Sequence, residues 1–210
     1  MNAANTRLVI IAEGRFVIPV LHRCLFILVA ILIGSIPFSL VTAYLIKRVD
    51  IRRHHDGNPG ALNALRTAGF AAGALGVIFD FSKGIFIVYY SRYHWTIESP
   101  ITWIAALGAI AGHMYSIYLR GRGGKGLAVT YGVLSGLSHG FAAMLMGGVS
   151  FLLKSLNLSP PMIVLPAILV VNVVYWFVYP FWLSRIGLAL IALLLFTRYS
   201  RELFNREKAS

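Results

Sequence analysis

The sequence has few acidic residues and a single cysteine, and both shortages restrict the class of protein. Seven Asp and Glu stand against nineteen Lys and Arg, which gives a formal net charge of +12 over 210 residues. With Cys24 alone, the chain can form neither an internal disulfide nor a cysteine-based metal site. Apolar residues are abundant instead, at 58% of the chain with a mean hydropathy of +0.76, and their runs are too long for one soluble core. We therefore predict an integral membrane protein.

The positive charge is concentrated in short stretches between the apolar runs. This pattern is typical of cytoplasmic loops in a multi-pass membrane protein. Because topology already accounts for the basic residues, the sequence predicts no binding of nucleic acid. The stretches expected at the cytoplasmic face are loop 47–66, loop 120–126 and a basic tail at 198–210.

Five apolar runs approach the roughly 20 residues that a helix needs to cross the hydrocarbon core. They are residues 24–46, 69–91, 100–119, 160–178 and 181–197. A further stretch, 127–153, is long for one helix and is interrupted near Ser138. One crossing there would leave the basic tail outside, whereas two short helices, 127–138 and 140–154, would keep it inside. We therefore predict an all-α membrane protein with about seven membrane segments, two of them short, and glycine-rich cytoplasmic loops.

The whole chain, residues 1–210, is expected to form one membrane domain, because no internal repeat or low-complexity linker occurs in it. Residues 8–20 look like a signal sequence, but Glu13, Gly14 and Arg15 interrupt the run and no small-residue cleavage site follows. Residues 1–23 are therefore interpreted as an interfacial leader.

Two polar loops have a composition that suits phosphate. In GNPG, residues 57–60, the glycines allow close approach of the backbone, and the following helix start can offer free amides. Arg66 adds a planar, permanently charged guanidinium for phosphate oxygens. In GRGGKG, residues 121–126, four glycines surround Arg122 and Lys125, so amides and two cations could hold a second anion. Such a basic turn can equally serve the topology alone, and it lacks the spacing of a Walker A loop.

A third polar cluster lies inside the apolar segments. Its members are Ser35, Asp80, Lys83 and His113, and ionisable groups at membrane depth are candidates for function because they are costly there. Asp80 and Lys83 are spaced i, i+3, so a self-neutralising structural pair is the alternative. A hydrogen-bonded structural histidine is likewise the alternative for His113, and His139 is interpreted as structural.

The order of these motifs resembles a known family. GSIPF is followed by GNPGA-N with an arginine, then FDF-KG, then GH-Y, with GGKG a few residues later. This combination, over about residues 30–135, is similar to the PlsY family of acyl-phosphate-dependent glycerol-3-phosphate acyltransferases. The resemblance implies a bacterial inner-membrane enzyme that transfers a fatty acyl group from acyl phosphate to the 1-hydroxyl of glycerol 3-phosphate. It implies no metal and no cofactor; the partners are the two substrates and membrane lipids, and the active site and the C-terminus face the cytoplasm.

The resemblance also assigns roles to residues. Lys125, Arg66 and His113 match the family pattern and are catalytic candidates, and Asp56 is added because of its position next to the first loop. Asp56, His113 and the acceptor's own phosphate are alternative bases. The candidates for substrate and phosphate binding are Gly57, Asn58, Gly60, Asn63, Arg122, Gly123, Gly124, Gly126, Asp80, Lys83 and Ser35.

Two stretches depart from the family pattern. His55 and Asp56 stand where the family usually has Gly-Ser, and the tail TRYSRELFNREK lacks the usual His-Arg-x-Asn. A carboxylate beside bound phosphate must be neutralised or paired, and Arg52, Arg53 and Arg66 are the expected partners of Asp56. The chain is thus a divergent member of the pattern. The alternatives are a catalytically silent or substrate-shifted member that binds a phospholipid precursor or a membrane partner, and a small anion transporter.

Overall fold

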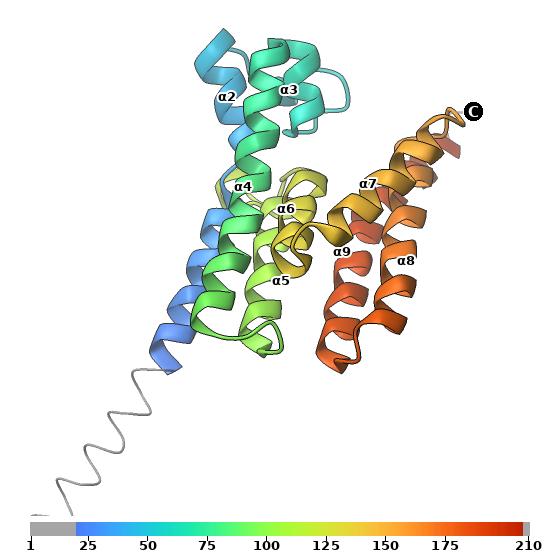
Figure 1. Ribbon diagram of the computed structural model, residues 1–210. Coiled ribbons are helices and arrows are strands. Elements are labelled where there is room, and N and C mark those ends of the chain that lie inside the picture. Colours follow the sequence, from blue (N-terminus) through green and yellow to red (C-terminus); the bar gives the residue numbers. More distant parts are fainter. Residues whose placement is uncertain (1–19, 208–210) are drawn as a thin grey trace, which may run out of the picture.

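Four helical stretches of the computed structural model, which describes residues 20–207, are long and apolar enough to cross a membrane (Figure 1). Helix α5 (Pro100–Met114) is extended by the 3-10 turn η2 (Ile117–Leu119) into one of these stretches. The other three lie in α4 (Phe70–His94), α8 (Pro160–Val178) and α9 (Trp182–Glu207). A fifth candidate span consists of the helical segment Val20–Ser35 and α2 (Phe38–Lys47), which are bent by 41°. The predicted all-α membrane fold is confirmed.

The first span differs from the prediction in two places, at its N-terminal side and in its middle. Residues 20–23, which the sequence assigned to a leader, are already helical, while residues 1–19 lie outside the described part. The span is also interrupted at Ile36 and Pro37, because proline has no amide hydrogen and its ring disrupts the preceding turn. The break exposes backbone carbonyls inside the protein, and these need partners.

The two short helices expected between the third and fourth long spans are present. Helices α6 (Leu127–Ser138) and α7 (Phe141–Lys154) are separated by His139 and Gly140, whose φ angles are 51° and 93°. Ser138 donates to Leu134 O and accepts from Ala142 N, so its hydroxyl joins the end of α6 to the start of α7.

Arg92 of α4 stabilises this break from outside. Its guanidinium donates to Gly136 O at 2.6 Å and lies 2.9 Å from Nε2 of His139. The side chain of His139 therefore has a structural contact, which agrees with its interpretation as a structural residue.

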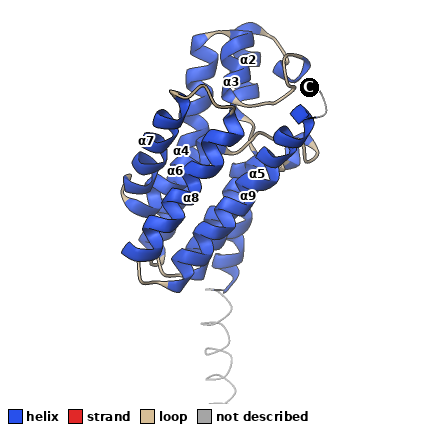
Figure 2. Cartoon of the chain, turned by 90° about the vertical axis from the view of Figure 1, so that its right-hand side faces the viewer, coloured by secondary structure: helices blue, strands red, loops and turns tan. Residues whose placement is uncertain are grey.

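The glycine-rich loops and the end of α9 lie at one end of the bundle (Figures 1 and 2). The chain between α2 and α4 forms the 3-10 turn η1 (Ile51–Arg53) and helix α3 (Ala61–Ala68). Lys125, which precedes α6, contacts both Asp56 in this chain segment and Glu202 in α9. The basic tail is not a separate segment, since α9 continues through residues 198–207.

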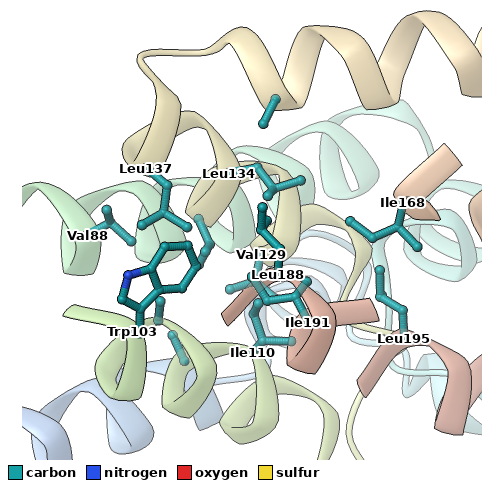
Figure 3. Packing of buried hydrophobic residues seen from close by; sticks show 14 of the residues in the cluster. Val88, Trp103, Ile110, Val129, Leu134, Leu137, Ile168, Leu188, Ile191 and Leu195 are labelled. Atoms are coloured by element: carbon teal, nitrogen blue, oxygen red, sulfur yellow. The ribbon is translucent and has the colours of Figure 1, made fainter. Parts of the chain in front are cut away.

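Small residues allow the helices to approach closely, as is usual inside membranes. A Cβ on Gly84 would collide with Val129 O, and one on Gly132 would collide with Phe81 O, so α4 and α6 need glycine at these positions. The largest buried cluster lies where α4, α5, α6, α8 and α9 meet (Figure 3). This packing places the first residues of α6 against the middle of α4, where the polar cluster lies.

Candidate active site

A cavity of about 390 Å³ opens at the end of the bundle where the two glycine-rich loops meet. Its polar lining comes from both loops and from the buried cluster, and its apolar lining includes Val77, Leu127 and Val164. Of the residues singled out in the sequence, the following line it: Asp56, Asn58, Gly60, Asn63, Arg66, Asp80, His113, Lys125 and Gly126. Motifs far apart in the sequence thus converge on one chamber with a polar mouth and apolar walls.

The first loop is held in shape by Asn63. Its side-chain nitrogen lies 2.8 Å from Ile51 O, 3.1 Å from His54 O and 3.0 Å from Asn58 O. Since an amide nitrogen has only two hydrogens, the three carbonyls share them. The buried Asn63 is therefore the organiser of the loop, and a direct role in phosphate binding is not needed to explain it.

Helix α3 begins at this loop and offers free donors to the cavity. Its N-cap is Gly60, which provides no side-chain oxygen, and the backbone N–H groups of Ala61 and Leu62 have no hydrogen-bond partner among residues 20–207. Arg66, one turn further on, is exposed, lines the cavity, and has no hydrogen-bond or ion-pair partner in the same range. Amides at a helix start next to an unpaired guanidinium suit an anion.

Lys125 lies at the mouth between two carboxylates. Its Nζ is 2.7 Å from Oε2 of Glu202 and 3.3 Å from Oδ2 of Asp56, and 5.9 Å from the centre of the Tyr199 ring. The expectation that an arginine would pair with Asp56 is therefore wrong. Lysine reaches it because the two loops converge in space.

Arg52, one of the arginines expected to pair with Asp56, has a different partner. Arg52 pairs with Asp50 at 2.7 Å, and this contact lowers the pKa of the Asp50 carboxyl to about 2. Asp50 also accepts from Arg52 N and so caps η1. This pair lies near the surface and does not line the cavity. It can therefore serve as a control when the ion pairs of the cavity lining are removed by mutation.

The buried cluster is centred on Lys83. Its Nζ contacts Oδ1 of Asp80 at 2.8 Å, and it donates to Gly34 O at 2.8 Å and Ile36 O at 2.9 Å. These are carbonyls that the break before α2 leaves without helical partners. Ser39 donates to Oδ2 of Asp80 at 2.8 Å. The structural interpretation of the Asp80 and Lys83 pair thus has direct support, because the pair joins α4 to the broken first span.

His113 connects this cluster to the cavity and to the second loop. Its Nδ1 is 2.9 Å from Nζ of Lys83. An ammonium has no lone pair, so with Lys83 charged beside Asp80 the ring nitrogen must accept, and the neutral ring carries its proton on Nε2. That nitrogen faces the backbone of Gly124. The arrangement favours His113 as a hydrogen-bond donor over His113 as a base.

Gly124 allows the second loop to lie on the His113 ring. Its amide donates to His113 O at 3.1 Å, and a Cβ at this position would collide with Nε2 of His113. We expect Gly124→Ala to displace the loop and lower activity at least tenfold, since misplacing a site by about 1 Å can cost 10²-fold. Gly148→Ala in α7 is the control for an added methyl group, because a Cβ there has nothing within 4 Å and the glycine is part of a helix. Equal activities of the two variants would contradict this packing argument.

Several predicted binding residues lie outside the cavity lining. Arg122 is exposed, Ser35 donates back to Ile31 O within its own helix, and Lys83 serves the cluster. The glycines Gly57, Gly123 and Gly124 shape the two loops instead of lining the chamber. Within the described residues, no group of three or more His, Cys, Asp or Glu is placed to hold a metal ion.

Sequence reasoning missed four side chains at this site: Ser39, Tyr131, Tyr199 and Glu202. The scarcity of acidic residues could have drawn attention to Glu202, since Glu202 and Glu207 are the only acidic residues after Glu98 in the sequence.

The fold and the site define an integral membrane protein with an anion-suited cavity at one end of a helical bundle. More specifically, the chain belongs to the family described as "Glycerol-3-phosphate acyltransferase", whose sequence profile matches residues 24–206. The resemblance noted in the motifs is thereby confirmed.

Individual relatives and solved structures agree with this assignment. Glycerol-3-phosphate acyltransferase of Bordetella pertussis is 41% identical over 112 residues, which cover 51% of each chain. The enzyme of that name from Halalkalibacterium halodurans is 37% identical over 162 residues, or 71% of this chain and 75% of that protein. This chain thus spans about half the length of some curated relatives and three quarters of another.

Two solved structures are similar to this chain over most of its length. The crystal structure of PlsY, an integral membrane glycerol 3-phosphate acyltransferase, in its glycerol 3-phosphate form superposes with a TM-score of 0.82 at 27% identity, covering 90% of this chain and 92% of that one. Its lysophosphatidic acid form gives a TM-score of 0.78 at 25% identity, with the same coverage.

Proposed function

We propose that this chain transfers a fatty acyl group from acyl phosphate to the 1-hydroxyl of glycerol 3-phosphate in phospholipid synthesis. The observation that carries the proposal is the single cavity in which an unpaired arginine and free helix amides at the mouth adjoin apolar walls. A phosphate-bearing acceptor fits the first feature and an acyl chain fits the second. The family and the glycerol 3-phosphate form of the similar structure support the same substrates.

The reaction needs positioning and charge stabilisation more than a cofactor. The acceptor hydroxyl oxygen bonds to the acyl carbonyl carbon, the bond from that carbon to the phosphate oxygen breaks, and phosphate leaves with the electron pair. The hydroxyl proton passes to a base. Negative charge develops on the carbonyl oxygen and on the leaving phosphate, so preorganised cations and amides near both lower the barrier.

The roles follow from the position of each group. Arg66 and the amides of Ala61 and Leu62 bind one phosphate, and Lys125 stabilises charge on the second phosphate or on the carbonyl oxygen. His113, with its proton on Nε2, is a donor next to the chamber. That leaves Asp56 and the acceptor's own phosphate as candidates for the base, because both lie at the polar mouth.

The Arg66 guanidinium is expected to contact two phosphate oxygens at once. Arg66→Lys should therefore raise the KM for glycerol 3-phosphate at least tenfold, because an ammonium is a point charge without the planar fork. Steady-state kinetics at constant ionic strength measure the effect. Arg53→Lys, which makes the same change on an exposed arginine of this segment outside the cavity, is the control. An unchanged KM in Arg66→Lys would remove this residue from the site.

We also propose that the protein lies in a bacterial cytoplasmic membrane with the cavity mouth and the C-terminus in the cytoplasm. The basic loops support this orientation. In a Cys24→Ser background, cysteines introduced at Gly57, Gly121 and Ser210 are expected to react with an impermeant reagent only from the cytoplasmic side. A cysteine at Thr96 should react only from outside. Labelling of Gly57 and Gly121 from opposite sides would contradict the shared cavity.

The direct test of the function is an assay with purified protein. Acyl phosphate and glycerol 3-phosphate together should give lysophosphatidate and inorganic phosphate in equal amounts. Omitting the acceptor should abolish lysophosphatidate formation. Binding of glycerol 3-phosphate without product would point to a catalytically silent member, and uptake of phosphate compounds into vesicles without product would point to a transporter.

A further inference from the structure

The cavity lining contains Arg66 and Lys125, and among the described residues Lys125 is bound by carboxylates whereas Arg66 is not. Glu202 of α9 lies on one side at 2.7 Å, and Asp56 of the loop before α3 lies on the other at 3.3 Å. About a quarter of the Lys125 and Glu202 side chains and half of Asp56 are exposed, at 28%, 23% and 54%. The three groups connect three separate parts of the chain across the cavity mouth.

The charges of this group oppose an incoming phosphate. Two carboxylates are set against one ammonium, so a phosphate that approaches Lys125 meets a net negative charge. Lys125 donates one of its three hydrogens to Glu202, and the Asp56 carboxylate lies within ion-pair distance of the same ammonium. Phosphate must therefore share Lys125 or displace an acid from it, whereas the unpaired Arg66 demands no such exchange.

We propose that Asp56 and Glu202 control the affinity of the cavity mouth for phosphate by competing with the phosphate of the substrate for Lys125. The identity of the substrate rests on the proposed function, whereas the competition for Lys125 does not depend on it. Together the two acids determine how tightly the cavity mouth binds a phosphate. If phosphate displaces Glu202 from Lys125, the contact between α9 and the second loop is also lost.

The test measures binding of inorganic phosphate to the detergent-solubilised full chain by calorimetry, without turnover. Glu202→Gln should tighten binding about three- to fivefold, the size expected for a partly exposed ion pair. Adding Asp56→Asn should tighten it further. Asp50→Asn is the matched control, because it removes the same charge from a carboxylate whose arginine partner lies outside the cavity.

A further variant, Lys125→Gln, distinguishes competition for Lys125 from a general repulsion between the carboxylates and phosphate. In a Lys125→Gln background, Glu202→Gln should no longer tighten phosphate binding, because there is no ammonium left to release. Equal tightening with and without Lys125, or unchanged or weaker binding in Glu202→Gln alone, would overturn the proposal. If Glu202→Gln fails to fold, Asp56→Asn alone provides the same comparison. A failure of acyl transfer with intact phosphate competition would overturn the proposed function only.

Discussion

Lys125→Ala is expected to lower the turnover of acyl transfer by about 10² to 10³, the usual loss when one preorganised donor to developing charge is removed. The lysine extends from a glycine-framed loop into the cavity mouth, where the acyl phosphate and the acceptor phosphate have to meet. The measurement is the initial rate of lysophosphatidate formation at saturating substrates, so that loss of turnover is separated from loss of affinity.

The control for this variant is Lys154→Ala, a lysine in the last turn of α7 that does not line the cavity. It should retain full turnover. A Lys125→Ala protein that remains folded and keeps turnover within threefold of the parent would show that the reacting groups lie elsewhere.

Asp80→Ala is expected to destabilise the protein by about 3–5 kcal/mol, because it leaves the Lys83 ammonium buried without its counter-charge. Both side chains of this pair are only 2% exposed. The lower stability should appear in thermal unfolding in detergent. It should also affect the bend before α2, since Lys83 donates to Gly34 O and Ile36 O there.

The exposed pair of Asp50 and Arg52 provides the comparison. Asp50→Ala removes the same charge from a pair of similar length, but solvent screens this pair, so its loss together with the η1 cap is expected to cost only about 1–2 kcal/mol. If Asp80→Ala unfolds at the same temperature as Asp50→Ala, the buried cluster does not stabilise the fold as described.

The helical segments could be predicted because each depends on local composition. Apolar runs identified the long spans, and the glycine and histidine near Ser138 marked the break between α6 and α7. The bend in the first span was not predicted, although Pro37 is visible in the sequence. A proline alone does not end a membrane helix, and what stabilises the break here is Lys83, which is distant in the sequence.

The sequence motifs that form the site could be predicted, but the contacts between their side chains could not. Both glycine-rich, basic loops were identified from their composition, and the structure shows that residues of both line one cavity. Pairing of Asp56 was expected with neighbours in the sequence and occurs with Lys125 instead. Glu202 escaped notice because its role arises only when α9 packs beside the second loop.

The most direct test of the central claim, that this cavity is the phosphate-binding site of the acceptor, is an experimental structure of this chain with glycerol 3-phosphate bound. The expected result places the phosphate within hydrogen-bonding distance of the Arg66 guanidinium and the amides of Ala61 and Leu62, with the 1-hydroxyl directed into the chamber. A phosphate bound outside the cavity, for example at the exposed Arg53 or Arg122, would contradict it.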